Sequence, residues 1–219
     1  MSASHAAGVT ASGGLRADAA RNRDRIVAAA REVFAAEGQK APLDEIARSA
    51  GVGNATLYRH FPTRRDLVVA VVRDVSERAA DRAEEALAAG VDPFEALRGL
   101  FLAGVEEKVG VMCTMLGTAD GDPGRRAAGD RLTQVVERLV LRARSTGTLR
   151  ADVTAGDVLL AIGRLTRPLP DGSECRLDGD LVRRQLLIFL DGLRAPAATE
   201  LPGTGPSVAD LRRVPAGLS

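Results

Sequence analysis

Apolar residues recur every three or four positions along most of the chain, and glycine or proline interrupts this pattern at short intervals. Such spacing is typical of amphipathic α-helices, because residues three and four apart share one helix face. Aromatic residues make up only 3% of the 219 residues and tryptophan is absent, which disfavours a β-sheet. Apolar residues reach 45%, enough for a hydrophobic core. The pattern therefore predicts an all-α protein with about nine helices.

Several residues mark where these helices begin and end. Gly38 follows the first apolar segment, Pro62 follows the third, and Pro93 stands in the first turn of the fifth. Thr63 has Asp66 three residues later, the spacing of a capping box, so we expect it to begin the fourth helix. The predicted helices cover about residues 17–37, 43–50, 54–60, 63–90, 92–105, 109–116, 125–145, 154–165 and 177–193.

Both ends of the chain lack this apolar periodicity. Residues 1–16 are mostly alanine, serine and glycine, and residues 195–219 contain four prolines among small side chains. Segments of this composition bury too little apolar surface to offset the entropy of ordering them. We therefore expect two disordered tails.

Charge is unevenly distributed, although the net charge is only +1. Residues 16–65 contain ten basic and six acidic side chains, a balance of +4, so the rest of the chain carries −3. A basic N-terminal part favours binding to nucleic acid. Charged helix faces are more often simply solvated, so the asymmetry needs a DNA-binding motif to support it.

Residues suited to catalysis, metal binding or disulfide formation are scarce. Cys113 and Cys175 are too few and too far apart for a disulfide framework or a zinc site. The two histidines are His5, in the N-terminal tail, and His60, and no glycine-rich phosphate loop is present. No signal peptide and no apolar run of membrane length is found. We therefore expect a cytoplasmic protein that is not an enzyme and has no cofactor, metal or membrane partner.

The segment LDEIARSAGVGNATLYRHF, residues 43–61, carries the most functional information. It predicts two short helices joined by a tight turn at Gly51, which supplies a left-handed conformation that a β-carbon would penalise. Ala47 is small where the helices cross, and Ile46 and Leu57 are expected in the core between them. This is the helix-turn-helix arrangement, whose second helix enters the DNA major groove by its N-terminal end.

The run AGVGNATLYRHFPTRRDL resembles the signature of the TetR family of transcriptional regulators, in which a valine-led turn precedes T-L-Y-x-[HY]-F and then [ST]-[KR]-x-x-L. The preceding DRIVAAAREVFAAEG is similar to the first helix of that family, and together these runs cover about residues 20–68. Gly53 stands where the family usually has serine or threonine, and Pro42-Leu43 replaces a common serine or threonine followed by a branched apolar residue. The first departure weakens the N-cap of the recognition helix.

The resemblance implies a DNA-binding domain at residues 17–65 whose recognition helix begins at Asn54. The residues expected at the DNA interface are Asn54, Ala55, Thr56, Tyr58, Arg59, His60, Thr63 and Arg64. Asn54 can pair with an adenine edge, whereas the methyl groups of Ala55 and Thr56 can meet a thymine methyl. Arg59 can reach a base or the DNA backbone.

Other positions in the motif are expected to contact phosphate. Tyr58 and His60 match family positions that usually do so, and Arg64 lies at the N-terminus of the fourth helix, where positive charge favours phosphate. Thr63 can act through its backbone N–H. Leu57 and Phe61 are interpreted as core residues, and core packing is the alternative role for Tyr58.

For residues 66–194 the resemblance implies a regulatory domain that dimerises through its last two helices, as a four-helix bundle, and holds a small-molecule effector. The residues expected at the dimer interface are Leu159, Ile162, Leu181, Gln185, Ile188 and Phe189. The candidate effector-binding residues are Phe94, Leu97, Phe101, Val105, Met112, Cys113, Met115, Leu116 and Leu139. For each of these taken singly, core packing is the commoner role, and Cys113 is more often an inert buried thiol than a redox switch.

The resulting hypothesis is a ligand-responsive repressor that binds an inverted-repeat operator in double-stranded DNA as a homodimer and is released by a small molecule. Two alternatives stay open. One is a transcriptional activator of the same family, and the other is a helical interaction module without DNA binding. Exposed basic residues such as Arg59 and Arg64 favour DNA binding over the second alternative.

Overall fold

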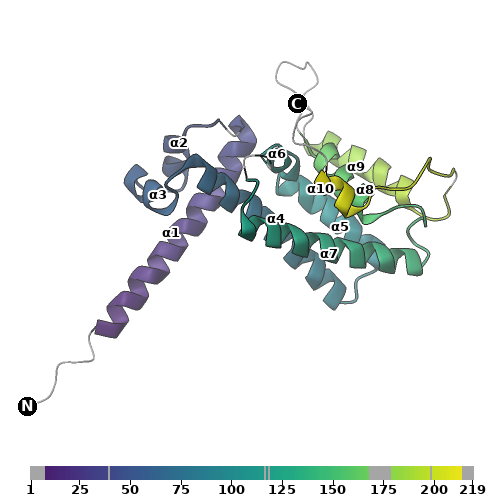
Figure 1. The fold of residues 1–219 in the computed structure, drawn as a ribbon, viewed down its shortest axis with the longest axis horizontal. Coiled ribbons are helices and arrows are strands. Elements are labelled where there is room, and N and C mark those ends of the chain that lie inside the picture. Colours follow the sequence, from purple (N-terminus) through teal and green to yellow (C-terminus); the bar gives the residue numbers. More distant parts are fainter. Residues whose placement is uncertain are drawn as a thin grey trace, which may run out of the picture. The chain divides into compact units, whose positions relative to one another are not determined.

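The computed structural model describes residues 8–38, 40–115, 117, 119–167, 179–197 and 199–213. Within these ranges the chain forms ten α-helices and no β-strand, so the all-α prediction is confirmed (Figure 1). None of the described helices is long and apolar enough to span a membrane. The helices are α1 (Gly8–Glu37), α2 (Leu43–Ser49), α3 (Asn54–His60), α4 (Arg64–Ala88), α5 (Pro93–Glu106), α6 (Val109–Cys113), α7 (Pro123–Ser145), α8 (Ala155–Leu165), α9 (Gly179–Leu193) and α10 (Val208–Arg213).

The predicted helix starts agree with the caps that the structure contains. The Thr63 and Asp66 side chains each accept a hydrogen bond from the other residue's backbone N–H, which completes the capping box before α4. Asp92 accepts from the N–H groups of Phe94 and Glu95, with Pro93 in the first turn of α5. The predicted start of the ninth helix at residue 177 lies outside the described residues.

The two predicted tails need correction. The first helix begins at Gly8 instead of residue 17, so part of the expected N-terminal tail is helical. Residues 199–213, expected to be disordered, are ordered and end in α10. The residues before 17 continue the helix outward from the packed part of α1, and their composition does not explain it. The helix α10 is held by its contacts with α8, which the local composition does not indicate.

The chain divides into two compact units, one ending at Val71 and the other beginning at Val72, so the division falls inside α4. The first unit consists of α1, α2, α3 and the first turns of α4. Its centre is filled by side chains that are almost completely buried, namely Ile26, Ala30, Phe34, Ile46, Leu57, Phe61, Leu67 and Val68. The packing of α1 against α2 and α3 fixes the two short helices of the predicted motif.

The second unit is a helical domain in which α5 packs against α7 and α9, and α8 packs against α6 and α7. The shared core includes Phe94, Leu97 and Phe101 of α5. Two ionic clusters hold the second part of α4 in this domain. The buried Glu107 carboxylate pairs with Arg78 and Arg82, at 2.7 and 2.9 Å.

The other cluster joins α4 to α7. The Arg131 guanidinium lies 2.7 Å from Asp81 and also pairs with Glu84. Because each of these arginines is partly exposed, we regard the clusters as fixing helix positions more than as large sources of stability.

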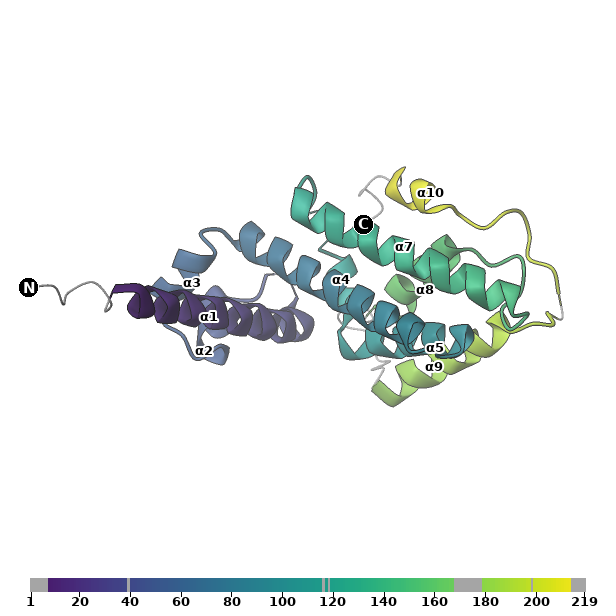
Figure 2. The ribbon, with the colours of Figure 1, turned by 90° about the horizontal axis from the view of Figure 1, so that it is seen from below.

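Residues 199–213, here called the C-terminal strap, fold back over the start of α8 (Figure 2). The Arg150 guanidinium is almost completely buried and donates to the Thr199 carbonyl oxygen at 2.6 Å, while Asp152 accepts from the N–H of Leu201 at 3.2 Å. The two Arg150–Asp152 hydrogen bonds, assisted by that N–H, lower the pKa of the Asp152 carboxyl to about 2. The strap is therefore an ordered part of the second unit.

Two glycines allow the strap to approach α8. A β-carbon at Gly156 would overlap the carbonyl oxygen of Pro206, and one at Gly205 would overlap the side chains of Thr154 and Asp157. The Thr154 hydroxyl also donates to that Pro206 oxygen at 3.0 Å. The backbone of the strap therefore approaches α8 so closely that only glycine fits at these two positions.

We expect Gly156→Ala to lower the free energy of unfolding by about 1–3 kcal/mol, because the strap must shift to admit the methyl group. Chemical denaturation measures this change. A matched pair lacking residues 196–219 is the control, since without the strap the same substitution should cost little. An equal loss with and without the strap would contradict the contact as its cause.

Candidate DNA-binding site

The turn between α2 and α3 has the predicted conformation. Gly51 has a φ of +65°, in the left-handed region, and the N–H of Val52 donates to the Ala47 carbonyl oxygen at 3.0 Å. Ile46, Ala47 and Leu57 are buried between the helices. These contacts hold α2 and α3 at one fixed angle, as a helix-turn-helix requires.

The recognition helix α3 begins with a backbone cap only. The N–H groups of Thr56 and Leu57 donate to the Gly53 carbonyl oxygen at 2.8 and 3.1 Å, and no side chain caps this end. Pro42 likewise offers no side-chain cap to α2. The weak N-cap inferred from Gly53 is thus present in the structure.

The outer surface of α3 is polar and accessible. Asn54, Ala55 and Arg59 are exposed, and Tyr58 is 48% exposed, so Tyr58 is not a core residue. Thr56 and His60 are half-buried on the same helix. Leu57 and Phe61 are buried, in agreement with their interpretation as core. The structure thus brings the six α3 candidates together on one short helix.

Two of these candidates are already held by other side chains. The Asn54 amide donates through Nδ2 to Oδ1 of Asp44, on α2, at 3.1 Å. The Arg59 guanidinium turns back along α3 and donates to the Thr56 hydroxyl at 3.1 Å and to the Ala55 carbonyl oxygen at 3.4 Å. Both side chains therefore have hydrogen-bond partners within the first unit.

The two candidates at the start of α4 have partners within the protein. The N–H of Thr63, expected to donate to phosphate, donates instead to Asp66 at 2.9 Å. Arg64 donates through Nη1 to the Ala41 carbonyl oxygen at 2.7 Å. A phosphate contact by the Thr63 N–H would break the capping box.

Sequence reasoning missed two residues near this surface. The Arg23 guanidinium of α1 lies 5.1 Å from the ring centre of Phe61, a cation–π contact at the end of α3. Asp44 contacts Asn54, as described. The signal for Arg23 is its spacing of three residues before the buried Ile26, which continues the packed face of α1, whereas nothing in the sequence pairs Asp44 with Asn54.

The candidate effector-binding residues lie in the second unit, where most of them are core. Phe94, Leu97, Phe101, Met112, Met115 and Leu139 are almost completely buried, and Val105 and Cys113 are half-buried. Leu116 and Cys175 lie outside the described residues, as does His5. Burial raises the pKa of the Cys113 thiol, and the positive charge of Arg167 offsets this only in part. The thiol is therefore protonated near neutral pH, as in an inert buried cysteine.

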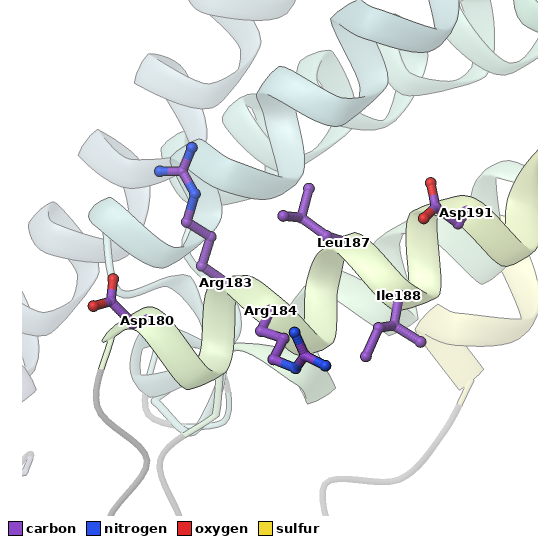
Figure 3. A pocket seen from close by; sticks show the side chains of 6 residues that line it. All are labelled: Asp180, Arg183, Arg184, Leu187, Ile188 and Asp191. Carbon is purple, nitrogen blue, oxygen red and sulfur yellow. The ribbon is translucent and has the colours of Figure 1, made fainter.

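Of the six candidate dimer-interface residues, three are exposed and three face the interior of their own domain. Leu181, Gln185 and Ile188 are exposed on one side of α9, at the spacing of i, i+4 and i+7, and Ile188 is 56% exposed. We call these three residues the α9 stripe. Figure 3 shows Ile188 pointing away from the neighbouring helices and Leu187 pointing toward them.

The other three interface candidates face the interior of their own domain. Ile162 is buried, Leu159 packs against the core, and the Phe189 ring lies 5.6 Å from the ring of Phe101. On α8 the exposed apolar residue is Leu160, which the sequence analysis did not select. Because five consecutive residues of α8, 158–162, are apolar, the sequence did not show which side faces the core.

No cluster of three or more potential metal ligands occurs among the described residues. The polar side chains of α3 form an exposed surface with hydrogen-bond donors and acceptors on one short helix. Such a surface is suited to reading the edges of DNA bases.

Comparison with known proteins agrees with this description. The sequence model of bacterial regulatory proteins, tetR family, matches residues 26–71, and that of the transcriptional regulator SbtR-like, C-terminal domain, matches residues 92–195. The solved TetR transcriptional regulator SCO0520 from Streptomyces coelicolor is 33% identical, with a TM-score of 0.60, over 80% of this chain and 99% of its own. A TetR regulatory protein from Mycobacterium vanbaalenii is 37% identical, with a TM-score of 0.59, over 83% and 99%.

A curated relative is similar over a shorter region. The HTH-type transcriptional repressor KstR2 of Mycolicibacterium smegmatis is 36% identical over 88 residues, which are 40% of this chain and 43% of that protein. The chain thus aligns with less than half the length of this relative.

The fold and the exposed recognition helix define a helix-turn-helix DNA-binding regulator with a separate helical domain. The chain belongs to the TetR family of transcriptional regulators. Members of this family bind DNA and small-molecule ligands and dimerise, and they are regulators instead of enzymes. The predicted family and the prediction that the chain is not an enzyme are therefore confirmed.

Proposed function

We propose that this regulator is a cytoplasmic repressor that binds a pseudo-palindromic operator as a homodimer and is released by a small-molecule effector. The observation that carries the proposal is the rigid α3, with Tyr58 and Arg59 exposed on it. The name of the M. smegmatis relative supports repression as the direction of regulation. A repressor of this kind blocks a promoter by occupying it.

A dimer is required by the geometry of DNA. Two recognition helices reach successive major grooves only when they lie about 34–36 Å apart, one helical turn of the duplex. Leu181 and Ile188 of the α9 stripe, together with Leu160 of α8, supply exposed apolar surface that a second copy would cover. We therefore assign the four-helix bundle to these faces of α8 and α9.

For the effector we propose a site bordered by α5, α6 and α8, near Val105, Met112 and Cys113. Methionine side chains adapt to apolar ligands of varied shape, and half-buried residues at this border give a ligand access to the core behind them. An effector that binds one arrangement of these helices more tightly shifts the population away from the DNA-binding arrangement. The affinity for operator then falls by the same coupling free energy.

The function is tested by incubating the purified full chain with fragmented DNA from its source genome and sequencing the retained fragments. We expect an enriched inverted repeat whose half-sites are about 10 base pairs apart, centre to centre. Enrichment equal to that of random fragments, with a folded protein, would contradict the proposal and favour the helical interaction module.

The direction of regulation is measured separately. A reporter gene behind the enriched repeat should be expressed more strongly in cells without the regulator. Lower expression in those cells would favour the activator alternative.

A further inference from the structure

We infer that Asp44 is a positioning residue for sequence readout, which orients the Asn54 amide so that α3 selects adenine at one position of each half-site. This inference rests on the proposed function, because it concerns how the operator is read. It assigns a role in specificity to a residue of α2, outside the recognition helix.

The geometry of the two residues carries the inference. Asn54 is the first residue of α3 and Asp44 lies in the first turn of α2, and both are exposed. Asn54 Nδ2 and Asp44 Oδ1 are 3.1 Å apart. The helices that carry them are held together by the buried Ala47 and Leu57 and by the Gly51 turn, so the two side chains meet on a rigid frame.

The chemistry of the pair allows only one orientation of the amide. A carboxylate only accepts hydrogen bonds, so the NH₂ group of Asn54, and not its carbonyl oxygen, must face Asp44. One N–H is then used, and the carbonyl oxygen and the second N–H remain for DNA. These are the two groups with which asparagine pairs with adenine, accepting from N6 and donating to N7.

Orientation in advance increases discrimination between bases. A free asparagine amide turns about its last side-chain bond and offers either end to a base, whereas the amide held by Asp44 offers only the adenine-pairing set. The nearby carboxylate also disfavours a phosphate or a carbonyl edge at this place by repulsion. The effect therefore appears in base preference more than in overall affinity.

Glu45 provides a matched control. It carries the same charge in the same first turn of α2, but its carboxylate pairs with Arg48 at 3.2 Å and not with Asn54. A general effect of negative charge near DNA, or of an acidic residue in the first turn of a helix, is shared by both residues. Of these two acidic residues, only Asp44 contacts the Asn54 amide and can orient it.

The test compares wild type, Asp44→Ala, Glu45→Ala, Asn54→Ala and the Asp44→Ala/Asn54→Ala double variant, each as the full chain. Each protein selects from a library in which the half-sites of the enriched operator are randomised, at one fixed salt concentration, and the retained DNA is sequenced. For Asp44→Ala we expect the adenine preference at one position per half-site to fall roughly two- to tenfold, the range given by one net hydrogen bond. Glu45→Ala should keep that preference.

Asn54→Ala should lose the preference at the same position, and adding Asp44→Ala should then change nothing further there. The inference is overturned if Asp44→Ala and Glu45→Ala select the same sequences, or if Asp44→Ala alters base preference equally with and without Asn54. A folded wild-type protein that selects no sequence would overturn the proposed function together with the inference, so the two failures are distinguishable.

Discussion

Replacement of Tyr58 or Arg59 by alanine is expected to weaken operator binding strongly while the dimer remains intact. Both side chains are exposed on α3, so their removal leaves the core of the first unit unchanged. A good contact to DNA contributes about 1–3 kcal/mol, and a symmetric dimer loses it twice. The expected loss of about 2–6 kcal/mol of binding free energy corresponds to a dissociation constant that is roughly 30-fold to 10⁴-fold higher.

Fluorescence anisotropy with the selected operator, at one salt concentration, measures this loss. Arg142→Ala is the matched control, because Arg142 is an exposed arginine on α7, in the second unit. It removes the same charge from the molecule and should leave affinity nearly unchanged. Unchanged affinity for both α3 variants would rule out α3 as the recognition surface.

The second large effect is expected for Ile188→Asp, which should convert the dimer to monomers at micromolar concentration. Ile188 is 56% exposed in one protomer and belongs to the α9 stripe, and in the proposed dimer the second copy would bury it. Loss of apolar burial amounts to about 1.5 kcal/mol or more in each copy, and an unpaired carboxylate in the interface adds a desolvation cost. The dimer dissociation constant should rise at least about 100-fold.

Sedimentation velocity over a concentration series measures this constant, with circular dichroism to verify native helicity. Leu141→Asp is the control, since Leu141 is a leucine of α7 that is 62% exposed and lies outside the proposed interface. Phe189→Asp is a poorer test, because its ring packs on Phe101 and the change would damage the core. A stable Ile188→Asp dimer with native helicity would refute the interface.

Local sequence was enough to predict most of the helices and the helix-turn-helix motif. Gly51 permits the left-handed turn, and Thr63 with Asp66 forms the capping box that their spacing predicts. Buried Leu57 and exposed Arg59 follow from helical periodicity on a short amphipathic helix. Each of these features depends on residues within about four positions of one another, so the sequence contains all the information required.

Contacts between distant segments could not be predicted in the same way. Residues 199–213 have the composition of a disordered tail, yet Arg150, Thr154 and Gly156 hold them against α8. The hydrogen bond from Asn54 to Asp44 depends on the crossing of α2 and α3. Neither contact can be read from the spacing of residues in the sequence. Each joins residues that only the folded structure brings together.

The sequence by itself determined the all-α class, the helix-turn-helix and the residues that α3 exposes, because helical periodicity and turn chemistry are local properties. Only the tertiary structure decided which apolar faces of α8 and α9 are core. Ile162 and Phe189 turned out to be inside and Leu160 and Ile188 outside, although all four belong to apolar stretches. A helix that is apolar on several sides can pack any of these sides against the core. Which side is buried depends on the neighbouring helices that fill the space around it.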